Sequence, residues 1–404
     1  MSIRAAHALL LLVAGCSVAG APPNQPPTTP TATASAATPS ASPAVAPRGI
    51  LRVGTSGDYA PFSTRDGSGQ PQGFDVDLAS ELAADLGFEL RWVPFRWPEL
   101  AQKLQAGEFD VAMGGVTWQP ARDVAGYMTR AVARGGPCVL GDANAARVAV
   151  NRGGILEAWA RAHLQGRELV TVDDNQSLPQ LLADGRAGAI VTDSFELHAF
   201  ARPGWAQRCE PALARKVYWI APAAPADLAP NIDAWLRDHA ERVQAAQQRW
   251  IGERQHLDAA THLIDLLARR FAFMPLVAAI KAERQLPIED LPREREVLDA
   301  VAAGARRVGL PEAATVQLFS LQIELSKAVQ RRQREPSPLD LGTQIRPALS
   351  ALGDRILAAL LEARTAKLSL SPPDLELLTP WLAPEERERL RAAVLAVLAA
   401  RAAP

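Results

Sequence analysis

The chain has 404 residues, a formal net charge of −1 and a sequence pI of about 6.6. This near-neutral balance indicates neither a nucleic-acid-binding patch nor an acidic tail, and the length predicts two or three domains. No stretch beyond the N-terminal region is long and apolar enough to predict a membrane span.

The first sixteen residues have the pattern of an export signal. Arg4 supplies a positive charge, residues 8–14 are apolar, and small residues precede Cys16. Residues 13–16 resemble a bacterial lipobox, which implies cleavage before Cys16, lipidation of its thiol and anchoring in the periplasm. An ordinary cleaved signal is the alternative. Residues 17–47 contain mostly Pro, Thr, Ala and Ser, so we expect a disordered tether.

Two cysteines remain after Cys16, namely Cys138 and Cys209. An even number of cysteines in an oxidising periplasm predicts one disulfide that closes a long loop. Two free buried cysteines are the alternative, since the sequence does not give the geometry that decides between them.

Short apolar runs alternate with helical patterns between Ile50 and about Gly252. The expected strands cover residues 51–54, 90–93, 111–113, 147–150, 169–172 and 189–192. The expected helices cover residues 76–86, 100–105, 155–164, 178–183 and 232–250. This alternation indicates α/β sheets, and its repetition after Cys138 predicts two lobes with a cleft between them. We assign this domain to residues 48–252.

Several motifs of this domain resemble the periplasmic solute-binding proteins for polar amino acids. They are residues 54–62, 73–77, Trp97 and 114–117, with Arg122 following. The resemblance implies that Arg122 clamps a ligand carboxylate, which suits its planar fork of donors. More narrowly, residues 57–59, 97–98, 134–136 and 151–157 resemble the cyclohexadienyl dehydratases, enzymes built on this scaffold.

Cyclohexadienyl dehydratases convert prephenate to phenylpyruvate or arogenate to phenylalanine. The ring hydroxyl must leave as water, so a carboxylic acid has to protonate it. The resemblance implies that Glu157 is this acid, and burial in a closed cleft would raise its pKa. The implied substrate-binding residues are Asp58, Tyr59, Trp97, Thr117, Arg122, Arg134, Asn151, Asn175, Asp193 and Lys216.

Residues 257–404 show continuous helical periodicity, which predicts an all-α domain. One amphipathic helix is expected from residue 263 to the break at residues 285–287, and it places Arg270 and Lys281 on nearly the same face, eleven residues apart. This helix ends before Pro287, and another begins near Asp290. Further breaks are expected at residues 309–311, 336–342 and 369–384, with a fourth helix over 345–367.

The spacing of seven polar residues in this part resembles that of the all-helical chorismate mutases. They are Arg270, Lys281, Asp290, Arg293, Glu294, Ser326 and Gln330. The resemblance implies that chorismate is rearranged to prephenate, a pericyclic reaction that requires no cofactor, nucleophile or proton shuttle.

The mutase resemblance also implies a role for each residue. Arg270 and Arg355 hold carboxylates with help from Ser326, because a fourth-helix arginine enters the site in the secreted mutases. Lys281 and Gln330 reach the ether oxygen. Glu294, with Asp290 and Arg293 nearby, positions the ring hydroxyl.

Together these patterns predict a lipid-anchored periplasmic enzyme with two consecutive activities. Its fold is a two-lobed α/β domain of the periplasmic-binding-protein type (type II) followed by an all-α domain. We expect small-molecule substrates, namely chorismate, prephenate and arogenate, and no nucleic acid. The membrane is reached only through the lipid anchor, and a homodimer is left open. The six histidines lack metal-ligand spacing, so no metal site is expected. The alternatives are a mutase joined to a non-catalytic receptor domain, or two binding modules.

Overall fold

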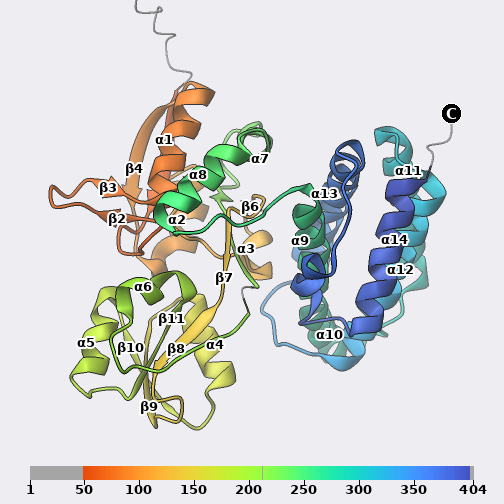
Figure 1. The fold of residues 1–404 in the computed structure, drawn as a ribbon. Helices are drawn as coiled ribbons and strands as arrows, with labels where there is room; N and C mark the ends of the chain where they lie inside the picture. The colour runs from red at the N-terminus through yellow and green to blue at the C-terminus, as the bar shows by residue number, and fades with distance from the viewer. Residues whose placement is uncertain (1–48, 212, 401–404) are drawn as a thin grey trace, which may run out of the picture. The chain divides into compact units, whose positions relative to one another are not determined.

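The computed structural model describes residues 49–211 and 213–400. The predicted export signal, the tether and Cys16 lie outside these residues. The described chain forms a two-lobed α/β part followed by a helical part (Figure 1). Within those two ranges, no helix combines the length and apolarity needed to cross a membrane.

The first lobe is built on a five-stranded sheet with the order β4-β1-β5-β14-β6. β1 lies parallel to β4 and β5, whereas β14 lies antiparallel to β5 and β6. Parallel neighbours need a crossover, which α1 and α2 provide. The elements are β1 (Ile50–Thr55), β4 (Glu89–Pro94), β5 (Val111–Ala112), β6 (Tyr127–Met128), β14 (Trp219–Ile220), α1 (Phe74–Leu86), α2 (Leu100–Gln105), α7 (Leu228–Asp238) and α8 (Ala240–Trp250). A hairpin of β2 (Thr64–Arg65) and β3 (Pro71–Gln72) precedes α1.

The second lobe has a sheet of the order β10-β9-β11-β8-β12. β9 and β11 are buried at almost every position, which explains why they are continuous apolar runs in the sequence. The elements are β8 (Pro137–Gly141), β9 (Arg147–Asn151), β10 (Glu168–Val172), β11 (Ala189–Asp193), β12 (Gln207–Cys209), α4 (Ile155–His163), α5 (Leu178–Ala183) and α6 (Leu197–Phe200). Cys138 and Cys209 form a disulfide that joins β8 to β12.

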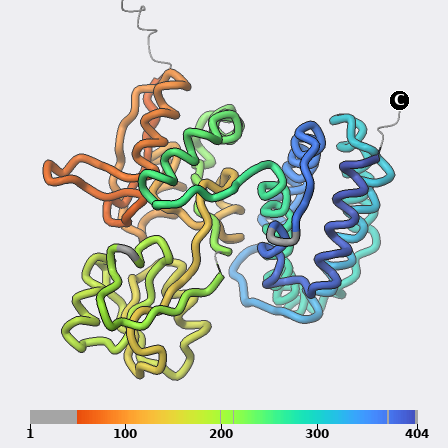
Figure 2. Tube along the Cα trace, viewed as in Figure 1, coloured from red at the N-terminus to blue at the C-terminus, as the bar shows by residue number. Residues whose placement is uncertain are grey.

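Two antiparallel segments, β7 (Ala133–Gly135) and β13 (Ala214–Lys216), connect the lobes, so the chain passes twice between them (Figure 2). The predicted strands and helices of this part are confirmed, with one correction. The closing helix predicted over residues 232–250 is two helices, because His239 leaves the helical conformation with φ −116° and ψ 35°. Its ring stacks on Trp235.

Within the described residues, the helical part has six α-helices: α9 (Ala259–Ala272), α10 (Met274–Glu283), α11 (Leu291–Val308), α12 (Glu312–Arg332), α13 (Arg346–Thr365) and α14 (Pro384–Ala399). α9 packs against α13, and α12 packs against α10, α11 and α14. α9 is the central helix, because nearly all of its residues are buried.

The continuous helix predicted from residue 263 to the break at residues 285–287 is divided between α9 and α10 at Phe273. Pro275 lies in the first turn of α10 and has no N–H to donate to the preceding turn, which explains the break. The predicted start near Asp290 is confirmed, since the Asp290 side chain caps α11 by accepting from the Arg293 N–H.

Candidate functional sites

A cavity of about 270 Å³ lies within the helical part, among α9–α13. Its lining includes every residue that the sequence predicts for this site except Arg355. These residues are Arg270, Lys281, Asp290, Arg293, Glu294, Ser326 and Gln330. They come from α9, α10, the start of α11 and the C-terminal part of α12, so the fold gathers positions up to sixty residues apart.

Two buried cations in this cavity, Arg270 and Lys281, have no carboxylate partner among the described residues. Arg270 donates only to the Leu349 carbonyl at 3.4 Å, and its Nε has no partner in the described chain. Lys281 donates to the Ile288 carbonyl at 2.7 Å. Burial lowers the pKa of Arg270 to about 10 and also lowers that of Lys281. Arg270 is therefore charged at neutral pH, and the pair favours an anionic ligand.

Neutral polar groups complete the cavity. Ser326 Oγ and Gln330 Oε1 are buried and have no hydrogen-bond partner within the described residues. Gln330 Nε2 contacts the Met274 sulfur at 3.6 Å. An unsatisfied buried polar group costs roughly 1–3 kcal/mol, so these atoms indicate a site prepared for a polar ligand.

Asp354 also lines this cavity and pairs with Arg307 at 3.5 Å. Three ion pairs join the other six charged residues of the lining. They are Arg346–Asp290 at 3.1 Å, Lys327–Glu294 at 3.0 Å and Arg293–Glu296 at 2.9 Å. Because these six groups neutralise one another in pairs, Arg270 and Lys281 supply the positive charge available to a ligand.

Arg355 does not line the cavity, so the structure does not bring it together with the other predicted residues. Its guanidinium donates to the Met128 carbonyl at 2.9 Å and lies 4.5 Å from the ring centroid of Tyr127. Arg346 begins α13 and lines the cavity instead. Nine residues separate the two arginines, about two and a half helical turns, so they point to opposite sides of α13.

A second cavity, of about 50 Å³, lies in the cleft of the two-lobed part. The predicted residues that line it are Tyr59, Trp97, Thr117, Arg122, Asn151, Asn175, Asp193 and Lys216. They come from both lobes and from the connecting segment β13. Gln176 donates to the Asp58 carbonyl across the cleft at 3.0 Å, so the described state is a closed one.

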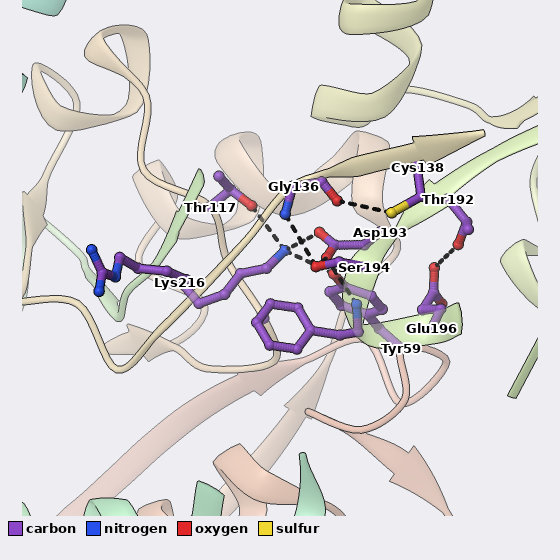
Figure 3. A network of polar contacts seen from close by, with 12 residues as sticks. Tyr59, Thr117, Gly136, Cys138, Thr192, Asp193, Ser194, Glu196 and Lys216 are labelled. Atoms are coloured by element: carbon purple, nitrogen blue, oxygen red, sulfur yellow. Dashed lines mark hydrogen bonds and ion pairs between the residues drawn. The ribbon is translucent and has the colours of Figure 1, made fainter. Parts of the chain in front are cut away.

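Lys216 is the centre of a buried polar network that joins the two lobes (Figure 3). Its ammonium donates to the Tyr59 hydroxyl at 2.7 Å, to Thr117 Oγ1 at 3.1 Å and to Asp193 Oδ2 at 2.8 Å. The side chains of Lys216 and Asp193 are only 2% and 4% exposed. All three ammonium donors are therefore used within the protein.

Arg122 is the cation of the cleft that has no carboxylate partner in the described chain. It lies in the short helix α3 (Pro120–Asp123) and donates to the Thr117 carbonyl at 2.8 Å. Burial lowers its pKa to about 10, so it stays protonated at neutral pH. Its remaining donors suit a carboxylate ligand.

Three predicted residues, Asp58, Arg134 and Glu157, are not among those that line this cavity. Glu157 accepts from the Gly153 N–H at 2.7 Å and from Arg161 at 2.5 Å. The backbone hydrogen bond, with help from Arg161, lowers the pKa of Glu157, so this carboxyl is ionised near neutrality. The backbone carbonyl of Asp58 accepts the hydrogen bond from Gln176 across the cleft. The backbone N–H of Arg134 donates to the side-chain oxygen of Gln255, and its carbonyl accepts from the Gln255 amide.

Glu196 is a functional candidate that the sequence patterns did not indicate. It ends the short 3₁₀ helix after β11 (Ser194–Glu196), is 1% exposed and lines the cleft. Asn175 Nδ2 donates to one carboxyl oxygen, and Thr192 Oγ1 lies 2.5 Å from the other. Burial raises the pKa of Glu196 to about 8, which keeps the carboxyl protonated near neutrality. The sequence signal that could have indicated Glu196 is its position just after an apolar run that forms a fully buried strand.

Comparisons with known proteins identify one family and several similar relatives. The family described as bacterial extracellular solute-binding proteins, family 3, matches residues 51–398. Cyclohexadienyl dehydratase of Pseudomonas aeruginosa is 32% identical over 223 residues, which cover 52% of this chain and 80% of that protein. A secreted chorismate mutase of Yersinia pestis is 33% identical over 108 residues, which cover 24% of this chain and 56% of the mutase.

Binding proteins are also similar. The L-cystine-binding protein of Escherichia coli is 32% identical over 159 residues, 36% of this chain and 59% of that protein. One similar solved structure is an ancestral amino acid-binding protein, described as a precursor of cyclohexadienyl dehydratase. It is 30% identical to this chain, and the TM-score is 0.46. The match covers 50% of this chain and 96% of the ancestral protein.

Proposed function

Because this chain belongs to family 3 of the bacterial extracellular solute-binding proteins, we propose that its two-lobed part is an enzyme on that scaffold and its helical part a second enzyme. The helical cavity converts chorismate to prephenate, and the cleft converts prephenate to phenylpyruvate or arogenate to phenylalanine. Homology to a cyclohexadienyl dehydratase and to a secreted chorismate mutase supports enzymes of the phenylalanine pathway. Export to the periplasm, with lipidation at Cys16, belongs to the same proposal.

The mutase proposal rests on one observation: two cations without a carboxylate partner among the described residues share a cavity with unsatisfied polar atoms. Chorismate carries two carboxylates and an ether oxygen on which negative charge grows in the transition state. In our proposal Arg270 holds one carboxylate, Arg346 reaches the other with the guanidinium donors that Asp290 leaves free, and Lys281 donates to the ether oxygen. Catalysis then consists of holding the reactive conformer and stabilising charge, without proton transfer.

Gln330 and Glu294 complete the proposed arrangement. The Gln330 amide donates an N–H toward the ether oxygen and needs no protonation to do so. Glu294 accepts from the ring hydroxyl. Replacing Lys281 by Met is expected to reduce chorismate turnover by at least roughly 100-fold, by analogy with loss of one transition-state donor. Lys367→Met, at an exposed position outside the cavity, is the matched control and keeps wild-type turnover.

The dehydratase proposal rests on Glu196, a buried carboxyl that holds its proton near neutrality inside the cleft. Arg122 binds a substrate carboxylate. Glu196 gives its proton to the ring hydroxyl, which leaves as water while the ring carboxylate leaves as CO2. The electron pair of the broken C–C bond enters the ring, which becomes aromatic, and solvent reprotonates Glu196.

A second candidate keeps the mutase and makes the cleft a receptor without chemistry. It is favoured by Arg122, whose free donors suit the carboxylate of any amino acid. Both candidates predict ligand binding, but only the dehydratase releases CO2. Supplying prephenate and measuring CO2 and phenylpyruvate therefore separates them.

A further inference from the structure

Lys327 lines the helical cavity but belongs to none of the motifs discussed above. It follows Ser326 on α12, and its ammonium lies 3.0 Å and 3.2 Å from the two carboxyl oxygens of Glu294. The side chains of Lys327 and Glu294 are only 18% and 21% exposed. The other carboxylate nearby, Glu289, lies 4.0 Å from Lys327 and is closer to Arg331, at 3.5 Å. Glu294 is therefore the main partner of Lys327.

The contacts of Glu294 leave it one free acceptor position. A carboxylate offers about four lone-pair positions. Lys327 uses two of them, and the Asp290 N–H makes a long contact of 3.4 Å with a third. The remaining one faces a cavity that holds no other donor to Glu294 among the described residues.

The charge of Lys327 also matters. Glu294 on its own would repel a dianionic substrate in a partly buried cavity, where charges are weakly screened. Pairing with Lys327 removes most of this repulsion and holds the carboxyl in one orientation. A substrate hydroxyl can then meet an oriented acceptor without the cost of a nearby negative charge.

We propose that Lys327 is a positioning residue of the mutase reaction, which orients and neutralises Glu294 so that this carboxylate accepts the hydrogen bond of the substrate's ring hydroxyl. This inference rests on the mutase function proposed above. Lys327 touches Glu294 and acts through it, so its effect on catalysis exists only while Glu294 is a carboxylate.

A double-mutant cycle on the full chain tests this dependence. Chorismate turnover is measured for the wild type, Lys327→Met, Glu294→Gln and the double variant, with Lys327→Gln as a second neutral variant. Lys327→Met is expected to reduce kcat/KM by roughly 10-fold or more, and Lys327→Arg to restore most of it. In the Glu294→Gln background, Lys327→Met is expected to change kcat/KM by less than about 3-fold.

Each outcome has a distinct meaning. Unchanged kcat/KM in both neutral variants, or losses that multiply in the double variant, would overturn the positioning role. A wild type that does not convert chorismate would overturn the mutase proposal and this inference together, whereas an active wild type with an unaffected Lys327→Met overturns the inference alone. Equal thermal unfolding midpoints of wild type and variants show that the losses are not caused by misfolding.

Discussion

Replacing Glu196 by Gln is the most informative change in the cleft, because it keeps the size of the side chain and removes its proton. The amide can retain contacts with Asn175 and Thr192, so the cleft is expected to keep its shape. General acid catalysis contributes roughly 10²–10⁴-fold, which equals about 3–5 kcal/mol of transition-state stabilisation. We expect kcat for phenylpyruvate formation to fall by that factor, while prephenate binding changes little.

Glu157→Gln is the matched control, because it makes the same chemical change at a residue outside the cleft cavity. It weakens contacts to Gly153 and Arg161, the second of which is an i,i+4 pair on the surface. Such pairs contribute about 0.3–0.5 kcal/mol, so activity should stay within about 3-fold of wild type. Turnover is followed by absorbance and mass spectrometry, and binding by calorimetry. A large loss in Glu157→Gln with an active Glu196→Gln would refute the assignment of the proton donor.

Three other changes test the rest of the account. Phenylpyruvate formation from prephenate is expected to fall as pH rises through about 8, because Glu196 loses its proton there. Mutase turnover is expected to stay flat between about pH 6 and 8, because the Gln330 amide does not titrate. A steep fall of mutase turnover in that range would contradict the role of Gln330. Asp265→Asn removes a carboxylate that is 3% exposed and pairs with the buried Arg215 and Arg269. Denaturant unfolding should show that the free energy of unfolding falls by roughly 3–5 kcal/mol. A fall below about 1 kcal/mol would contradict the pairing. Arg346→Met should lower the mutase kcat/KM by roughly 10-fold or more, and a normal value in that variant with a selective loss in Arg355→Met would restore the assignment made from sequence.

The fold was largely predictable because its local signals are strong. Strands such as β9 and β11 are buried on both faces and therefore form continuous apolar runs. Strands of two or three residues, such as β6 and β12, leave too little pattern to be recognised. The break between α9 and α10 depends on Pro275, whose effect the apolar periodicity around it concealed.

The residues of the helical site were predicted from a spacing that resembles a known family, and the fold brings seven of them to one cavity. Arg355 lies outside this cavity, because the start of α13 sets which side of that helix each residue faces, and the sequence did not show where α13 begins after the preceding loop. In the cleft, Glu157 and Glu196 differ in burial and hydrogen bonding, and only the fold shows which carboxyl is enclosed. In the local sequence, both residues are simply glutamates near the start of a helix, so the sequence does not distinguish them.

The central claim is that one chain performs two consecutive reactions. A time course of the purified protein supplied with chorismate alone, followed by absorbance and mass spectrometry, tests it most directly. The account predicts that prephenate appears transiently and that phenylpyruvate and CO2 accumulate. Prephenate that accumulates without further change would leave the mutase and make the cleft a receptor, and unchanged chorismate would contradict the account.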